Sequence, residues 1–331
     1  MKIGFYTAGL GISGGNKRVL RFAQELVKLS HSVTVIVPHS FRERETVIYP
    51  CRVANEKDVM NEEFDFILGM NPVYCSFKYF SKFKVKKRGI YILHLNDKGK
   101  YSPAYQKWIN YFKGSENFYV FGNNPDWKKY YDVEGIKNTY DLIGGIDIKP
   151  RKNKLRKRKK NVFSIVCNAS SLEWKGFEIV KNALNRWRIK DVFLDVIAFA
   201  VGKAEIYDSR WPIKLYYNFP YEKMPEIYMQ GDVFVYCEDK QAGWGNTAIE
   251  AMICGVPVIC TKWGTTAYAK HLENAYIVEN DATDLRNAIE KLYLDIKLRK
   301  KLIIPYRDRV KLFNEFSYNR LVLKFLKHVE Y

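Results

Sequence analysis

The sequence predicts an α/β fold made of two domains, each built around a parallel sheet. Its 331 residues are enough for two domains of ordinary size and too many for one simple core. Continuous apolar runs alternate with amphipathic helical stretches, a pattern typical of strands that are buried on both faces beneath helices. A basic stretch near the middle interrupts this alternation, which restarts after it. Together these observations favour two α/β domains in tandem.

The first domain is predicted over residues 1–148. Its opening strand leads through a Gly-rich turn into a helix from about Lys17 to Leu29. Runs that are continuously apolar and rich in β-branched residues favour strands. The predicted strands are Ile3–Thr7, Ser32–Val37, Phe64–Leu68, Gly89–Leu93 and Phe118–Phe121.

A linker is predicted over residues 149–161. Residues 149–160 are nearly all basic and include no acidic residue. Such a stretch repels itself and favours a solvated linker over a binding patch. We therefore expect the chain to pass here from one domain to the next.

The second domain is predicted over residues 162–310, with a helix from about Phe177 to Trp187. From about Thr283 onward the chain is mostly helical. We expect its basic, amphipathic last part, 311–331, to form a helix that packs toward the first domain. The predicted strands are Val162–Cys167, Val192–Ala198, Ile213–Tyr217, Val233–Tyr236, Val256–Cys260 and Tyr276–Val278.

The composition excludes wholesale disorder and points to anionic partners. Hydrophobic residues make up 47% of the chain, which is ample material for buried cores. The formal net charge of +19 favours nucleotide diphosphates, anionic lipid head groups or nucleic acid, without choosing among them. No apolar run approaches the length of a membrane span. We therefore expect a cytoplasmic protein, and peripheral contact with a membrane is left open.

The most informative segment lies in the second domain and combines a glycine turn with the start of a helix. Gly243 and Gly245 allow the backbone to approach a ligand closely. Asn246 and Thr247 open the helix, whose N-terminus offers N–H groups and a positive dipole end to a phosphate. Glu250 follows on the first turns and can accept hydrogen bonds from a diol such as a ribose. The alternative is an ordinary helix capped by Asn246 or Thr247.

Three short motifs surround this helix: Gly243-Trp244-Gly245, Glu250-Ala251-Met252 and Gly255-Val256-Pro257-Val258. In register they resemble the signature of retaining nucleotide-sugar glycosyltransferases of the GT-B fold, family 4. The resemblance implies two Rossmann-like domains facing a central cleft that binds the donor. It implies metal-independent transfer of a sugar, with retention, from a nucleotide-diphosphate donor to a glycan, lipid or protein acceptor. No cofactor is implied, because the nucleotide sugar is a co-substrate, and no Asp-x-Asp suggests a metal clamp.

The resemblance also assigns roles to individual residues. Glu250 would bind ribose hydroxyls, and Lys175 would neutralise the departing phosphates. His94, at the end of a strand, would face the donor sugar, with a purely structural histidine as an equal alternative. The predicted catalytic residues are therefore His94, Lys175 and Glu250. The predicted donor-binding residues are Gly14, Gly15, Lys17, Ser170, Lys175, Phe219, Glu238, Asp239, Gly243, Gly245, Asn246, Thr247 and Glu250.

Two positions depart from the family pattern. Ala242 stands where the family has a glutamate that contacts the donor sugar, and Ser170 stands where it has an arginine. Three explanations for Ala242 are open. Glu238, Asp239 or Gln241 reaches the same hydroxyl, the donor lacks that contact, or the protein is a degenerate relative that binds nucleotide with little transfer. We favour altered sugar recognition, because the ribose-binding half of the signature is retained.

A basic nucleic-acid-binding protein is the non-enzymatic alternative. No recognisable nucleic-acid module appears, and the basic run 149–160 lacks interleaved aromatic residues. Nucleic acid is therefore the less favoured partner. An anionic membrane surface is the more economical account of the charge.

Overall fold

The computed structural model divides into two compact units. Unit 1 comprises Met1–Gly145 together with Phe316–Tyr331, and unit 2 comprises Ile146–Glu315. The divisions thus fall after Gly145 and Glu315, where we predicted 148 and 310. The residues that the structure describes are 1–7, 9–10, 14–39, 48–70, 75–95, 103–127, 135–152, 161–202, 204, 206 and 209–330. Most of the predicted linker, 153–160, lies outside the described residues, and 149–152 belongs to unit 2.

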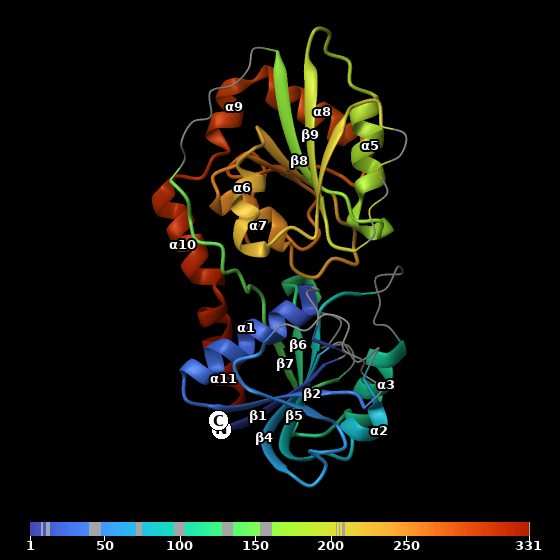
Figure 1. Ribbon diagram of the computed structural model, residues 1–331, viewed down its shortest axis with the longest axis vertical. Helices are drawn as coiled ribbons and strands as arrows, with labels where there is room; N and C mark the ends of the chain where they lie inside the picture. The colour runs from blue at the N-terminus through green and yellow to red at the C-terminus, as the bar shows by residue number, and fades with distance from the viewer. Residues whose placement is uncertain are drawn as a thin grey trace. The chain divides into compact units, whose positions relative to one another are not determined.

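Unit 1 is built on a parallel sheet with the strand order β3-β2-β1-β4-β5-β6-β7 (Figure 1). Its strands are β1 (Lys2–Thr7), β2 (Ser32–Val37), β3 (Arg52–Asn55), β4 (Glu63–Met70), β5 (Lys84–Ile92), β6 (Phe118–Gly122) and β7 (Asn138–Asp141). Its helices are α1 (Gly14–Lys28), α2 (Phe77–Phe80), α3 (Pro103–Phe112), the 3-10 helix η1 (Pro125–Trp127) and α11 (Tyr318–Val329). Helices cover both faces, which is why the central strands β1 and β4 are mostly buried and apolar.

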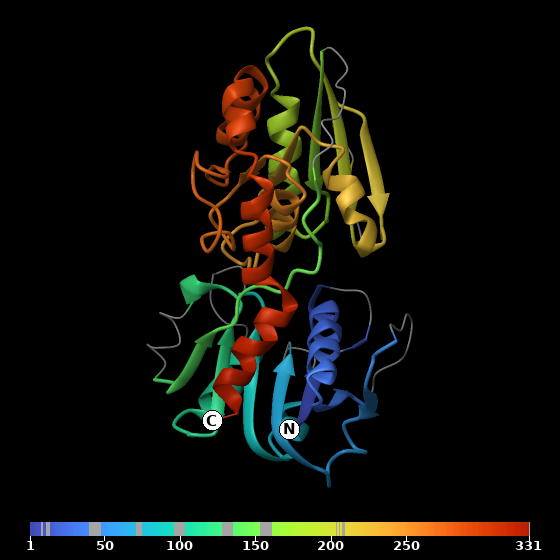
Figure 2. The same cartoon turned by 90° about the vertical axis from the view of Figure 1, so that its left-hand side faces the viewer.

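The last helix of the chain is part of the core of unit 1. α11 and α1 contribute side chains to one hydrophobic cluster, and α2 and α3 contribute to another on the opposite face of the sheet (Figures 1 and 2). The helix begins after Ser317, whose hydroxyl caps it by accepting from the Arg320 N–H at 3.3 Å. The predicted helix 311–331 is therefore two helices, since α10 (Tyr306–Phe316) ends before this cap.

Unit 2 is built on a second parallel sheet with the strand order β10-β9-β8-β11-β12-β13. Its strands are β8 (Val162–Asn168), β9 (Phe193–Ala200), β10 (Ile213–Tyr217), β11 (Val233–Tyr236), β12 (Val258–Cys260) and β13 (Tyr276–Ile277). Its helices are η2 (Glu173–Lys175), α5 (Phe177–Asn185), η3 (Tyr221–Lys223), α6 (Met224–Tyr228), α7 (Asn246–Ile253), α8 (Ala282–Leu294), α9 (Ile296–Lys301) and α10. Two parallel α/β sheets confirm the predicted fold class.

The register of β8 against β11 decides which loops of unit 2 meet. Ile165 pairs with Val233 and Cys167 pairs with Val235, so both strands end at the same edge of the sheet. The loops that follow, 169–176 and 237–245, therefore leave the sheet side by side. In open parallel sheets, ligands bind outside this carboxyl edge.

In the part of the chain that the structure describes, no helix is both long and apolar enough to cross a membrane.

We predict that Phe325→Ala destabilises unit 1 by about 3–5 kcal/mol, because truncating a buried aromatic side chain leaves a cavity. Phe325 is fully buried, and its ring lies 5.8 Å from that of Phe22, 5.4 Å from Phe66 and 5.5 Å from Phe121. Urea unfolding followed by tryptophan fluorescence measures the loss. The control is Leu323→Ala, on the exposed side of α11. Equal, small effects of both variants would contradict the packing of α11 in this core.

Candidate functional site

A glycine brings Lys175 against the end of β11. Gly176 has a φ of +73°, and a Cβ atom built on it would lie 2.0 Å from the carbonyl oxygen of Cys237. Only glycine fits this close approach of two backbones. As a result, Lys175 Nζ lies 2.5 Å from Glu238 Oε1 and 4.0 Å from the ring centroid of Trp174. Two predicted site residues that are far apart in the sequence are thus in direct contact.

The contact between Lys175 and Glu238 is a partly buried ion pair. The side chain of Lys175 is 22% exposed and that of Glu238 is 7% exposed. Burial, and then the charge of Glu238, raise the pKa of Tyr236 well above its ordinary value, so the neighbouring phenol stays protonated. Because the pair is neutral overall, Lys175 presents its full charge to a bound anion only when Glu238 finds another donor. The roles predicted separately for these two residues are therefore coupled.

Ser170 and Asp239 shape the two loops. The Leu172 N–H donates to Ser170 Oγ at 3.4 Å, and the Gln241 N–H donates to Asp239 Oδ1 at 2.8 Å. Short polar side chains stabilise turns in this way. Ser170 is buried and neutral, so it supplies no charge at the position of the family's arginine. Ser170 and Asp239 therefore contribute to the conformation of the two loops.

The glycine turn before α7 is required by packing. A Cβ atom at Gly245 would lie 2.7 Å from the hydroxyl oxygen of Tyr268, which donates to the Gly245 carbonyl at 2.6 Å. The Gly245 N–H donates to the carbonyl of Gly264 at 2.9 Å. The same turn brings the Gly243 carbonyl oxygen within 2.9 Å of a Cβ built at Gly264. The sequence predicts that these glycines allow a ligand to approach, whereas in the structure their close neighbours lie within the protein.

The first turn of α7 carries buried polar atoms that no described residue satisfies. Gly245 is the N-cap, and no side chain caps the helix, so the predicted alternative of a cap by Asn246 or Thr247 is wrong. Asn246 Oδ1 and Thr247 Oγ1 are buried without a hydrogen-bond partner among the described residues. Buried polar atoms normally have partners, and an uncapped helix N-terminus attracts anions. This turn is therefore suited to a bound polar group.

Glu250 is held by two tyrosines. It is 2% exposed, and its two carboxylate oxygens accept hydrogen bonds from the hydroxyls of Tyr221 and Tyr228, the latter at 2.8 Å. Burial first, and the charge of Glu250 second, raise the pKa of both tyrosines well above the ordinary value. Both hydroxyls therefore stay protonated and donate. A carboxylate has about four acceptor positions, and these two donors occupy two of them.

Tyr221 and Tyr228 are not among the site residues predicted from the sequence. One signal was available, because a carboxylate within the apolar helix 248–253 needs donors from a neighbouring element.

Phe219 lies two residues before Tyr221 and packs edge-to-face on Tyr216 at 5.2 Å, so it stands at the same loop as predicted. Burial is the largest cause that raises the pKa of Tyr268, and the charges of Cys260, Glu238 and Glu250 raise it further. We call Lys175, Glu238, Asn246, Thr247, Glu250 and the tyrosines 221, 228 and 268 the α7 cluster.

The predicted residues of unit 1 form their own group. Gly14 and Gly15 open α1, and a Cβ atom at Gly15 would lie 3.4 Å from Leu93 Cδ1. The first turn of α1, with the half-buried Lys17, therefore lies against the loop that carries His94 just beyond β5. His94 is half-buried at the carboxyl edge of this sheet, as predicted from its place after a strand.

A buried carboxylate at this edge of the unit 1 sheet was also missed. Glu56 is fully buried just after β3, and one of its oxygens accepts from the hydroxyl of Tyr6. Its other oxygen lies 2.6 Å from Nδ1 of the half-exposed His39. Burial first, and then its hydrogen bond to Glu56, raise the pKa of Tyr6 far above the ordinary value. The sequence hid this cluster because Glu56 follows a short edge strand without a continuous apolar run.

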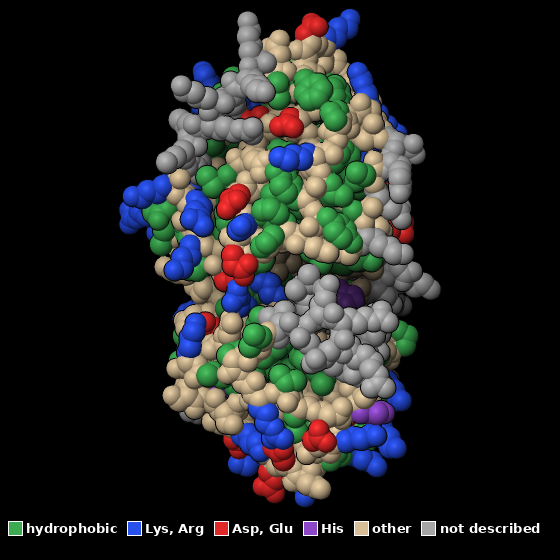
Figure 3. Space-filling model, in the orientation of Figure 1, with side chains coloured by type: hydrophobic (Ala, Val, Ile, Leu, Met, Phe, Trp, Pro, Cys, Tyr) green, Lys and Arg blue, Asp and Glu red, His purple; other side chains and the backbone are tan. Residues whose placement is uncertain are grey.

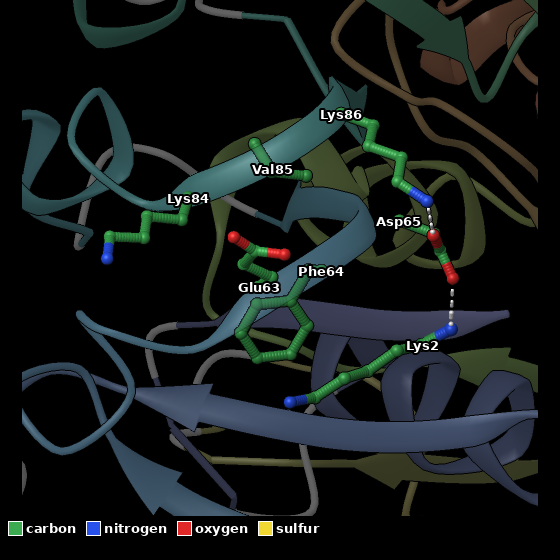
Figure 4. Close-up of a pocket in the computed structure, with 7 residues that line it drawn as sticks. All are labelled: Lys2, Glu63, Phe64, Asp65, Lys84, Val85 and Lys86. Carbon is green, nitrogen blue, oxygen red and sulfur yellow. Dashed lines mark hydrogen bonds and ion pairs between the residues drawn. The ribbon is translucent and has the colours of Figure 1, made fainter.

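A pocket of about 460 Å³ lies at the opposite edge of the same sheet, where β1, β4 and β5 begin (Figure 4). One ion pair lies within it: Asp65 accepts from Lys86 Nζ at 2.7 Å and also from the Lys2 backbone N–H at 2.8 Å. The hydrogen bond from Lys86 holds the pKa of Asp65 below its usual range. None of the predicted site residues lines this pocket, which is therefore separate from the candidate site.

Comparison with known proteins agrees with this geometry. Residues 160–295 match the family described as "Glycosyl transferases group 1", a range that includes the whole α7 cluster. Comparison with curated protein sequences found no match.

Three solved structures are similar over nearly the whole chain. HepE of Anabaena, in complex with UDP and glucose, has a TM-score of 0.74 and 15% identity, and the match covers 100% of this chain and 99% of that chain. Sucrose-phosphate synthase of Thermosynechococcus elongatus has a TM-score of 0.74 and 15% identity, with 98% of this chain and 97% of that chain covered. WaaG, a glycosyltransferase involved in lipopolysaccharide biosynthesis, has a TM-score of 0.73 and 12% identity, with 99% of each chain covered. At these identities the likeness establishes the fold. The chain therefore has the GT-B fold, and its residues 160–295 match the pattern of the group 1 family.

Proposed function

We propose that the protein is a glycosyltransferase that moves a sugar, taken to be a hexose, from a nucleotide-diphosphate donor to an acceptor hydroxyl. The observation that carries the proposal is the start of α7. There Asn246 Oδ1 and Thr247 Oγ1 are buried without described partners, one turn before Glu250. Uncapped N–H groups with unsatisfied polar atoms favour a bound phosphate. The family match and the likeness to a UDP complex support a nucleotide donor.

In this proposal the donor phosphates lie at the start of α7 and the ribose hydroxyls bond to Glu250. Glu238 leaves Lys175 for a hydroxyl of the donor sugar, which frees the ammonium to neutralise the departing phosphate. This exchange gives Glu238 the role of the glutamate that Ala242 replaces. It also accounts for a pair whose two predicted roles are otherwise in conflict.

We propose transfer with retention and without a metal. The acceptor hydroxyl attacks the anomeric carbon from the face that the diphosphate leaves, and the departing phosphate takes its proton. No pair of hydrolase-type carboxylates is needed for that step. Lys175 and the dipole of α7 supply the positive charge that Mg²⁺ supplies in other transferases. The acceptor is a hydroxyl of a glycan, lipid or protein.

A nucleotide-binding protein with little transfer is the second candidate. Two observations favour it: the charge of Lys175 is held by Glu238, and Ala242 is 1% exposed with no carboxylate in its place. Both candidates require nucleotide binding at the α7 cluster. They differ in whether the sugar is released from the donor.

We predict that at least one of UDP, GDP and ADP, alone or as its sugar, raises the melting temperature of the protein. Glu250→Gln should weaken the binding of that nucleotide at least tenfold, because a hydrogen bond to a charged group contributes about 1.5–3 kcal/mol. Thermal shift measured against each variant's own baseline tests this. The control is Glu226→Gln, an exposed carboxylate on α6. If none of the nucleotides raises the melting temperature, the proposed donor site is wrong. Equal shifts in the two variants would show that Glu250 does not bind the nucleotide.

We predict that Lys175→Gln lowers release of UDP from a UDP-sugar by about 10²-fold, because one preorganised charge at a developing anion has roughly that effect. The matched control is Lys240→Gln, an exposed lysine in the neighbouring loop. Initial rates of nucleotide release measure both. Unchanged turnover in Lys175→Gln would contradict the phosphate role, and no turnover in the wild type would favour the second candidate.

We predict that Ala242→Glu lowers both stability and turnover, because the added carboxylate enters a site that is 1% exposed and already closed. Ala242→Gln serves as the control for size without charge. Melting temperature and nucleotide release are measured side by side. Turnover that rises in Ala242→Glu alone would show instead that the lost glutamate had been needed, and that the protein is a decayed relative.

A further inference from the structure

An exposed corner of unit 2 combines aliphatic and basic side chains. α8 ends at Leu294, which is 67% exposed, and α9 begins at Ile296, which is 52% exposed. Lys297, Lys300 and Lys301 follow and are all exposed. We call these five residues the α9 patch. Large aliphatic side chains that lie so open to water next to charges mark an interaction surface.

Helical spacing puts the α9 residues of this patch on one face. Ile296, Lys297, Lys300 and Lys301 occupy positions i, i+1, i+4 and i+5, which point to the same side of a helix. Arg299, between them, is turned inward and only 6% exposed, with its guanidinium 5.2 Å from the ring centroid of Phe163. The inward face holds the helix on unit 2 and leaves the patch facing solvent.

The lysines of the α9 patch are available for an external anion. None of Lys297, Lys300 and Lys301 has an ion-pair partner among the described residues, unlike Lys291, which lies 3.8 Å from Asp295 Oδ2. Asp295 is itself engaged as the N-cap of α9 and accepts from the Leu298 N–H at 2.9 Å. The positive charge of the patch is therefore not balanced locally.

The chain around the patch extends the same charge. The charged residues classed as exposed from position 291 to position 313 are all basic, while the partly exposed Asp295 and Asp308 lie 3.8 Å and 2.9 Å from Lys291 and Lys311. α9 and α10 follow each other along one side of unit 2 (Figures 1 and 2), and Lys and Arg side chains gather over α10 in Figure 3. The patch thus lies within a basic side of this unit.

We propose that the α9 patch docks unit 2 on the surface of a bilayer that contains anionic lipids. Leu294 and Ile296 enter the boundary between head groups and acyl chains, and the three lysines contact anionic head groups. Charge complementarity requires an anionic partner, and the two aliphatic side chains require an apolar layer directly beneath its charge. A nucleic acid offers the negative charge but has no apolar layer directly beneath it. This docking is independent of the donor site, because the patch shares no residue with the α7 cluster.

The test uses the full chain and sedimentation with vesicles of phosphatidylcholine alone or mixed with phosphatidylglycerol. We expect binding to the mixed vesicles only. Replacing all three patch lysines by glutamine should weaken it roughly 100-fold, about fivefold for each charge near an anionic surface. The matched control replaces the exposed Lys190, Lys223 and Lys240 by glutamine, which changes the net charge equally. Equal losses in the two triple variants would overturn the proposal.

A second variant tests the aliphatic half. Leu294→Ser with Ile296→Ser should weaken binding to the mixed vesicles at least tenfold, because buried apolar area contributes to interfacial binding. The same variant should bind random double-stranded DNA as the wild type does. Unchanged vesicle binding, or tighter binding to DNA than to vesicles in the wild type, would overturn the proposal. Melting temperatures of all variants should match the wild type, since every changed side chain is exposed.

Discussion

The parallel pairing of β8 with β11 is the constraint on which the candidate site depends. It ends both strands at the same edge, so the loops 169–176 and 237–245 meet although they are far apart in the sequence. Gly176 then allows the backbones to touch, and this contact sets the ion pair between Lys175 and Glu238. The second loop leads directly into α7. A shift of this pairing by one residue would turn every side chain of β11 to the opposite face and separate the two loops.

Three buried carboxylates recur at the carboxyl edges of the sheets, and each is matched by donors. Glu250 has two tyrosines, Glu238 has Lys175, and Glu56 has Tyr6 and His39. Burying a carboxylate without donors is costly, so these partners are needed for folding whatever the ligand. The first turn of α7 differs, because its buried Asn246 and Thr247 oxygens have no partner among the described residues. That contrast is why the proposed function rests on the start of α7.

The periodicity of apolar residues was sufficient to predict the fold class but not the partners of the site residues. β2, β10 and β11 have the predicted bounds. β3 and β7 were missed, since short edge strands need not be apolar on both faces. The sequence located the helix that carries Glu250, yet its partners Tyr221 and Tyr228 come from another element and leave no mark in local spacing. Likewise, Gly245 was attributed to a ligand because the hydroxyl of Tyr268 that packs against it is distant in the chain.

The central claim is that a nucleotide binds at the carboxyl edge of the unit 2 sheet, between the start of α7 and Glu250. Hydrogen–deuterium exchange of the full chain, with and without UDP, tests it most directly, because backbone N–H groups that bind phosphate exchange more slowly. The account predicts slower exchange in peptides that cover 169–176 and 237–253, and unchanged exchange at the α9 patch. A UDP-dependent change confined to other segments, with these two unaffected, would contradict the account.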